Sequence, residues 1–179
     1  MSNQRNLRNI ALIGFMGTGK STVGRLVADQ LRFEFVDTDD LIEKRAGKTV
    51  RDIFAQAGEA AFRQMEKDLV TELATRSGLV ISAGGGLAAQ PGNLDSLKTH
   101  ALVIALWAAP EKIWQRVRHQ THRPLLDCAD PLAKIRTLLA EREPFYRQAD
   151  VMVNTDLRPI KAVAQQVAHQ FRMGQVPPT

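Results

Sequence analysis

The chain has little cysteine and no long apolar run. Its 179 residues include one cysteine, Cys128, which excludes an internal disulfide and a zinc site built from several cysteines. No apolar stretch approaches the roughly 20 residues that a membrane-spanning helix needs. The polar start MSNQRNLRN leads into a short apolar segment without the small-residue cleavage site of a secretory signal. These absences predict a cytoplasmic protein that does not insert into a membrane.

Concentrated positive charge is also lacking. The net charge is +5, but the lysines and arginines are spread along the chain without a basic block or interleaved aromatic residues. This pattern argues against nucleic acid as a partner and is as well explained by small anionic ligands. The length is that of one domain, residues 1–179, without linkers or repeats. Because the sequence indicates no large apolar surface beyond what the core requires, we expect a monomer.

Short apolar runs alternate with helical patterns along the chain. Most of the runs are unbroken, which is typical of strands buried on both faces of a parallel sheet. The predicted strands are Ile10–Ile13, Phe33–Val36, Leu79–Ser82, Leu102–Trp107 and Val151–Val153. The alternation predicts an α/β fold of three layers, with a five-stranded parallel sheet flanked by helices.

Several helix ends can be read from the same sequence. Thr49 and Asp52 form a capping box at a helix start, and Gly58 is expected to end or kink that helix. Pro159 precedes a helix whose apolar stripe runs to Phe171. The tail, residues 173–179, is expected to fray.

Residues 14–21, GFMGTGKS, match the pattern GxxxxGK[ST] in full. They lie between an apolar strand and a helix, which is the context that this phosphate-binding motif requires. Backbone N–H groups of such a loop converge on phosphate oxygens, and the helix N-terminus adds a positive dipole end. Lys20 is expected to contact the β- and γ-phosphates, and the Ser21 hydroxyl to bind Mg²⁺. The motif predicts a nucleoside triphosphate ligand, with Thr22 as a further phosphate contact.

An acidic segment, VDTDD at residues 36–40, ends the second predicted strand. Carboxylates at the carboxyl end of a parallel strand, beside a phosphate loop, lie where ligands bind in open α/β sheets. One is suited to assist Mg²⁺, and another to orient or deprotonate an attacking hydroxyl. Taken alone, the segment is equally typical of a solvated turn. The NKxD motif of regulatory GTPases is absent, and no later strand ends in an aspartate.

Other segments carry arginines or glycines. Arg63 and Glu66 are three residues apart, so the acid can hold the guanidinium in place, although a plain surface ion pair has the same spacing. The glycines of SAGGG, residues 82–86, either admit a ligand close to the backbone or form an ordinary loop. Arg123, in an irregular stretch, and Arg142 are each typical of a surface by themselves. An arginine on a mobile loop is nevertheless what a kinase lid needs, and we expect a lid at about 116–131.

In order along the chain, these segments resemble the shikimate kinase family, P-loop small-molecule kinases related to the nucleoside monophosphate kinases. The resemblance rests on GFMGTGKST, DTD, FRxxE, GGG, RPLL and the RxPxY segment that begins at Arg142, and it covers residues 10 to about 160. Many families share the phosphate loop, whereas DTD, FRxxE and GGG at these separations are far more specific.

The resemblance implies ATP-dependent phosphorylation of the shikimate 3-hydroxyl, on the route to chorismate and the aromatic amino acids, with one Mg²⁺ bound with ATP. It assigns Mg²⁺ to Ser21 directly and to Asp37 through water. The ATP-binding residues that it implies are Gly17, Thr18, Gly19, Lys20, Ser21, Thr22, Arg116, Arg123 and Pro159.

For the acceptor, the resemblance implies that Asp39 binds the ring hydroxyls and orients or deprotonates the attacking one. Because positioning supplies much of the barrier reduction, a raised pKa of Asp39 is not required. Arg63 and Arg142 are expected to clamp the shikimate carboxylate. Arg123 is expected to reach the transferred phosphoryl group, and backbone amides at Gly84, Gly85 and Gly86 to complete the pocket.

The alternatives are other kinases on the same scaffold and proteins that do not transfer phosphate. A gluconate-type kinase also needs a carboxylate clamp, but FRxxE and GGG argue against it. A nucleotide kinase should carry a longer base-binding insertion between the second and third strands. Intact Lys20, Asp37, Asp39 and Arg123 argue against a degenerate nucleotide-binding regulator, and a nucleic-acid-binding NTPase is the least favoured alternative.

Overall fold

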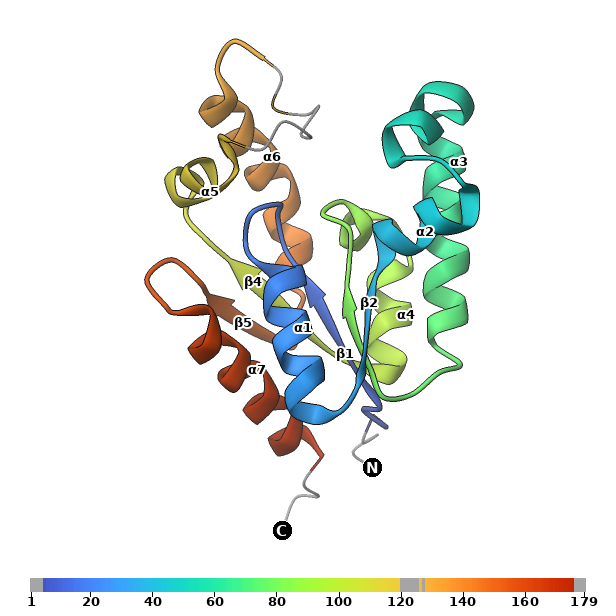
Figure 1. Cartoon of the computed structure of the whole chain (residues 1–179), viewed down its shortest axis with the longest axis vertical. Coiled ribbons are helices and arrows are strands. Elements are labelled where there is room, and N and C mark those ends of the chain that lie inside the picture. Colours follow the sequence, from blue (N-terminus) through green and yellow to red (C-terminus); the bar gives the residue numbers. More distant parts are fainter. Residues whose placement is uncertain (1–4, 120–125, 127, 176–179) are drawn as a thin grey trace.

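The strands of the protein form one parallel sheet. A computed structural model describes residues 5–119, 126 and 128–175 of the chain. The strand order in the sheet is β2-β3-β1-β4-β5 (Figure 1). The strands are β1 (Asn9–Ile13), β2 (Glu34–Asp37), β3 (Leu79–Ser82), β4 (Ala101–Trp107) and β5 (Val151–Asn154). Each lies within one residue of its predicted bounds, which confirms the predicted parallel sheet.

The central strand β1 explains why the apolar runs do not alternate. Ile10 pairs with Val80 of β3 on one side and with Leu102 of β4 on the other. Every residue of β1 is buried, because helices cover both faces of the sheet. Apolar side chains are therefore required on both faces of this strand.

The helices lie in two layers, one on each face of the sheet (Figure 1). The apolar stripes of α1 and α7 pack on one face, against Ile10, Leu12 and Ile104. Apolar residues of α3, α4 and α6 belong to a second core that includes Ala11 and Ile13. The helices are α1 (Lys20–Leu31), α2 (Thr38–Ala46), α3 (Val50–Leu73), α4 (Asn93–His100), α5 (Pro110–Val117), α6 (Pro131–Tyr146) and α7 (Ile160–Gly174), with a 3₁₀ turn η1 (Leu87–Ala89). The predicted three-layer architecture is confirmed.

The predicted signals at the start of α3 are present. Thr49 is the N-cap, and its hydroxyl accepts a hydrogen bond from the Asp52 amide at 3.1 Å. Gly58 has φ 81° and ψ 170°, which breaks the helical path inside α3. The helix is therefore kinked at Gly58, as predicted.

The two segments predicted to be irregular have different outcomes. Helix α7 continues through Gly174, two residues into the segment expected to fray, where the Gln175 side chain donates a hydrogen bond to the Leu7 carbonyl at 3.3 Å. Residues 176–179 lie outside the described residues. Of the expected lid, α5 supplies 116–117 and Asp130 caps the start of α6. Residues 120–125 and 127, including Arg123, lie outside the described part, so the mobile lid stays a prediction.

Among the helices described, none has the length and apolarity needed to cross a membrane.

Candidate active site

The phosphate loop joins β1 to α1 and makes hydrogen bonds within itself. The Phe15 carbonyl accepts hydrogen bonds from the Lys20 ammonium at 3.0 Å and from the Thr18 hydroxyl at 2.8 Å. Gly14 has φ 136°, and a Cβ at this position would lie 2.3 Å from the Leu106 carbonyl oxygen. Only glycine fits there, because the loop turns back directly over the end of β4. The sequence motif thus corresponds to a compact, self-bonded loop.

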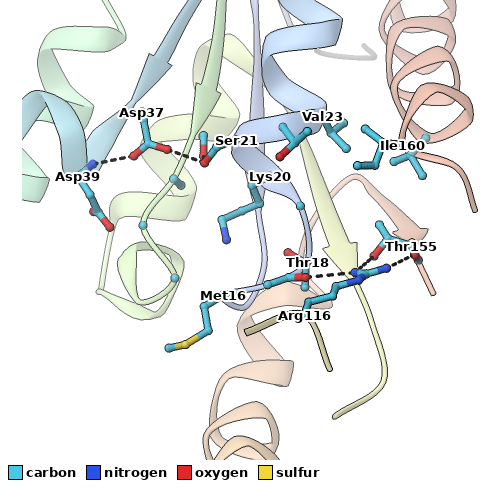
Figure 2. A pocket seen from close by; sticks show the side chains of 18 of the residues that line it. Met16, Thr18, Lys20, Ser21, Val23, Asp37, Asp39, Arg116, Thr155 and Ile160 are labelled. Atoms are coloured by element: carbon cyan, nitrogen blue, oxygen red, sulfur yellow. Dashed lines mark hydrogen bonds between the residues drawn. The ribbon is translucent and has the colours of Figure 1, made fainter. Parts of the chain in front are cut away.

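A cavity of about 610 Å³ opens beside this loop, at the carboxyl ends of the strands. Figure 2 shows Lys20 extending into it, with Asp37, Asp39 and Ser21 on one side and Arg116 and Thr155 on the other. The predicted site residues that line it are Gly17, Thr18, Gly19, Lys20, Ser21, Thr22, Asp37, Asp39, Gly84, Gly85 and Arg116. Loops more than 90 residues apart in sequence therefore form one site, as expected at this edge of a parallel sheet.

Several side-chain oxygens that could coordinate a cation lie close together at the start of α1. The Ser21 hydroxyl donates a hydrogen bond to Asp37 Oδ2 at 2.8 Å. The Ser82 hydroxyl oxygen lies 3.3 Å from the Ser21 hydroxyl oxygen. Asp37 also caps α2, because its Oδ1 accepts from the Asp39 amide at 3.2 Å. Hydroxyl and carboxylate oxygens suit Mg²⁺, which usually keeps several waters and binds substrate phosphates. The described residues contain no cluster of three or more His, Cys, Asp or Glu that could hold a metal, so a cation at Ser21 and Asp37 would need phosphate or water oxygens as well.

Asp39 lies in the first turn of α2 with an unusual environment. Burial, and after it the nearby charge of Asp37, raises the pKa of this carboxyl to about 6, against the opposing charge of Lys20. Its Oδ1 atom is buried and has no hydrogen-bond partner among the described residues. A Cβ at Gly84 would lie 2.4 Å from that oxygen, so only glycine lets the carboxylate sit here. An unsatisfied buried acceptor beside a cavity is suited to a hydroxyl donor from a ligand.

The three glycines that follow β3 each face one of the side chains predicted to bind substrate. Gly84 faces Asp39, as described above. A Cβ at Gly85 would lie 3.4 Å from Arg142 Nη1, and one at Gly86 would lie 3.1 Å from both terminal nitrogens of Arg63. Arg63, Gly86 and Arg142 do not line the cavity itself, but the glycine segment joins them to it. The structure thus brings α2, α3 and α6 together around GGG.

Arg63 is held by two acids of its own helix. Its Nη1 donates to Glu66 at 2.8 Å, which confirms the predicted pair, and its Nη2 donates to Glu59 at 2.8 Å. The Glu66 side chain is only 1% exposed, and burial raises the pKa of its carboxyl above the usual value even though Arg63 opposes the shift. The guanidinium is therefore fixed in direction before any ligand binds.

Arg116 connects the phosphate loop to the segment that follows β5. It donates to the Gly17 carbonyl at 3.1 Å, and to the Thr155 hydroxyl and carbonyl at 3.0 and 2.5 Å. Thr155 was not predicted, although it directly follows β5 and the rule that identified the acidic segment applies to it equally. Pro159 does not line the cavity, but its neighbours Arg158 and Ile160 do.

A phosphate loop, oxygen donors for a cation and a separate pair of arginines on one sheet edge define a P-loop kinase that acts on a small anionic molecule. Comparison with known proteins makes this assignment specific. The family model described as Shikimate kinase matches residues 16–172. The chain belongs to the shikimate kinase family.

Individual relatives agree with the family match. The shikimate kinase of Caldanaerobacter subterraneus subsp. tengcongensis is 44% identical over 165 residues, which are 92% of this chain and 96% of that protein. The structure of shikimate kinase from Acinetobacter baumannii in complex with shikimate superposes with a TM-score of 0.89 at 37% identity, covering 96% of each chain. A gluconokinase from Sinorhizobium meliloti 1021 reaches a TM-score of 0.60 at 17% identity, covering 94% of each chain, and so shares the fold alone. The family resemblance predicted from the sequence is confirmed.

Proposed function

We propose that this protein transfers the γ-phosphoryl group of ATP to the 3-hydroxyl of shikimate, on the route to chorismate and the aromatic amino acids. The observation that carries the proposal is the glycine segment 84–86. Its three glycines face Asp39, Arg142 and Arg63 in turn, next to the cavity of about 610 Å³. Shikimate has a carboxylate and several hydroxyls, so it needs both kinds of group.

On the nucleotide side, the amides of Gly17 and Gly19 and the N-terminus of α1 bind the β- and γ-phosphates. Lys20 neutralises charge on the transferred group, and Thr18 and Thr22 add polar contacts. Ser21 and Asp37 would hold the Mg²⁺ that accompanies ATP and neutralises phosphate charge. Arg116 and the Pro159 segment border the adenine.

On the acceptor side, Arg63 and Arg142 bind the shikimate carboxylate, which two guanidinium groups recognise by geometry as well as by charge. Asp39 accepts a hydrogen bond from the 3-hydroxyl and takes up its proton as the oxygen attacks the γ-phosphorus. The bond from that phosphorus to the β–γ bridging oxygen breaks, and ADP leaves. Arg123, outside the described residues, is proposed to stabilise the transferred group from the lid.

We place this reaction in a monomeric, cytoplasmic enzyme. One chain supplies Lys20, Asp39, Arg63 and Arg142 from its own loops and helices, so the site does not need a residue from a second copy. Size-exclusion chromatography with light scattering measures the oligomeric state, and a mass near 19.9 kDa is expected.

The function is tested by an ADP-release assay with Mg-ATP and shikimate, with gluconate and CMP as parallel acceptors. ADP release that depends on shikimate alone is expected. Turnover with gluconate or CMP but not with shikimate would retain the kinase and reject the acceptor. Failure with all three acceptors, in protein that binds ATP, would favour a regulator that has lost transfer.

The carboxylate clamp predicts a selective effect of the variant Arg63→Lys. Lysine keeps a positive charge beside the buried Glu66, so the domain should fold, but it lacks the planar fork of donors. We expect the KM for shikimate to rise about tenfold, because one charge-assisted hydrogen bond to its carboxylate is lost. The KM for ATP should stay within about twofold of wild type. Steady-state kinetics with each substrate varied in turn measures both constants.

The variant Arg45→Lys is the matched control for this prediction. Arg45 donates to both carboxylate oxygens of Glu72 at 2.6 and 2.8 Å, but both side chains are exposed and remote from the cavity. Arg45→Lys should leave both KM values unchanged. An equal rise of the two KM values in Arg63→Lys would contradict the role of Arg63 as a shikimate ligand.

A further inference from the structure

Tyr146, the last residue of α6, makes a buried contact with the glycine segment. It is the sole tyrosine of the chain, it is 4% exposed, and its hydroxyl donates a hydrogen bond of 2.6 Å to the Gly85 carbonyl. This bond ties α6 to the loop after β3, two elements that are 61 residues apart at the contact. A backbone amide or a water molecule could also satisfy this carbonyl. A buried tyrosine hydroxyl in this position therefore indicates a specific role.

The same helix face carries Arg142, one turn before Tyr146. Arg142 lies against the Cα of Gly85, with Nη1 3.4 Å from the position of a Cβ there. Its guanidinium carbon also lies 5.5 Å from the centre of the Phe15 ring, in the range of a cation–π contact. Helix α6 therefore contacts Gly85 twice, through Arg142 at its Cα and through Tyr146 at its carbonyl.

The contact also fixes the direction of the next amide. The Gly85–Gly86 peptide is planar and trans, so its N–H points away from its C=O. Holding the Gly85 oxygen toward Tyr146 therefore turns the Gly86 N–H away from the phenol. Within the described part of the chain, neither the Gly85 nor the Gly86 amide donates to another protein group. Two backbone donors stay available beside Arg142 and Arg63.

We propose that Tyr146 is a positioning residue of the carboxylate site: its hydroxyl holds the Gly85–Gly86 peptide in one orientation and at one distance from Arg142. The inference rests on the proposed function, because the anion so positioned is the shikimate carboxylate. Tyr146 does not touch the substrate in this role. It acts through the glycine segment, because glycines have no side chain that could hold their backbone in place.

The phenol is suited to this role because it stays a donor. Burial raises the pKa of the Tyr146 hydroxyl to about 12, so it remains protonated wherever the enzyme is folded and active. A carbonyl oxygen can only accept, and an ionised phenolate would leave it unpaired.

The test uses the variant Tyr146→Phe, which keeps the ring and removes only the hydroxyl. The KM for shikimate should rise about threefold to tenfold, the range for loss of one hydrogen bond, while the KM for ATP and kcat stay within about twofold. Thr137→Val is the matched control: it removes a hydroxyl from the exposed side of the same helix, where the Thr137 hydroxyl donates a hydrogen bond to the Ala133 carbonyl. This control should leave all three constants unchanged.

A second readout does not depend on a variant that folds. Because the chain has one tyrosine, incorporation of 3-fluorotyrosine gives a single ¹⁹F resonance that reports on Tyr146 alone. Shikimate should shift this resonance, and the methyl ester of shikimate, which lacks the carboxylate charge, should shift it much less.

Three results would overturn the proposal. They are equal rises of both KM values in Tyr146→Phe, an unchanged KM for shikimate in this variant, or a ¹⁹F resonance that shikimate does not shift. Wild-type protein that does not phosphorylate shikimate at all would instead reject the proposed function, and this inference with it. The two failures are distinguishable, because the first requires an active wild-type enzyme.

Discussion

Replacing Asp39 with asparagine should lower kcat by a factor of about 10² to 10⁴, the usual contribution of a positioned general base, and leave the KM for ATP within about twofold. Asparagine has nearly the same shape and still accepts a hydrogen bond, but it cannot take up the hydroxyl proton. The nucleotide contacts proposed for Lys20 and Ser21 do not involve this side chain. Steady-state kinetics and direct ATP binding measure the two effects, and near-normal turnover would remove Asp39 from the chemistry.

Asp68→Asn is the control for the same chemical change. Asp68 lies exposed on α3, where its carboxylate accepts a hydrogen bond from Gln64 at 2.7 Å. This variant should keep wild-type kcat and KM.

The raised pKa of Asp39 gives this prediction a pH dependence. The active form is the carboxylate, so kcat/KM of the wild type should fall about tenfold per pH unit below pH 6, where the folded carboxyl becomes protonated. In Asp39→Asn, this descending limb should be absent from the residual activity. A wild-type profile that stays flat down to pH 5 would contradict the assignment of the base.

The same pKa predicts a change in stability with a definite sign. The pKa of Asp39 is about 6 in the folded protein against 3.8 for a free aspartate side chain, so its contribution to stability is most favourable below pH 3.8 and is lost as the pH rises through 6. At pH 8 the ionised form costs up to about 3 kcal/mol. Asp39→Asn should therefore unfold at a higher Tm than wild type at pH 8, with a smaller difference at pH 4.5. A lower Tm of the variant at pH 8 would show that the buried carboxylate is stabilised in some other way.

Replacing Lys20 with alanine should lower kcat by at least about 10³, because in the proposed reaction its positive charge stabilises the transferred phosphoryl group. The domain should still fold. The Phe15 carbonyl, which accepts from Lys20, also accepts from the Thr18 hydroxyl, so it is not left unpaired. The ADP-release assay and thermal unfolding followed by circular dichroism check the two halves of this prediction.

Lys134→Ala provides the comparison for Lys20→Ala. Lys134 is exposed on the first turn of α6, away from the cavity, and its removal should change neither kcat nor Tm. A Lys20→Ala protein that is folded and turns over at a rate near that of wild type would reject the assignment of the phosphate loop.

The sheet could be predicted from sequence because its chemistry is local. Strands buried on both faces require unbroken apolar runs, and the runs from Ile10 and Leu79 have no other explanation of comparable strength. The pairing of Arg63 with Glu66 follows from helix geometry alone. The kink at Gly58 could be predicted because glycine disfavours a helix interior, and the observed φ of 81° is one that glycine adopts without strain.

What could not be predicted depends on contacts between distant segments. The segment VDTDD looks like an acidic turn, but its second half is the first turn of α2, and the burial of Asp39 comes from packing against Gly84. Nothing local in the sequence shows that raised pKa. The contacts of Thr155 and Tyr146 likewise depend on partners more than 35 residues away. Thr155 follows a strand and Tyr146 belongs to the RxPxY segment, but neither signal shows which group each side chain contacts.

The bond between Lys20 and the Phe15 carbonyl has a consequence for repeated turnover. A lysine that moves freely in the empty enzyme would lose about 1.5–2 kcal/mol of rotamer entropy each time a nucleotide arrived. Here the hydrogen bond to Phe15 restricts the side chain when the chain folds, so part of that entropy is lost before a nucleotide binds. A nucleotide therefore meets a lysine that is already restricted, and less entropy is lost in each cycle of binding than with a freely moving side chain.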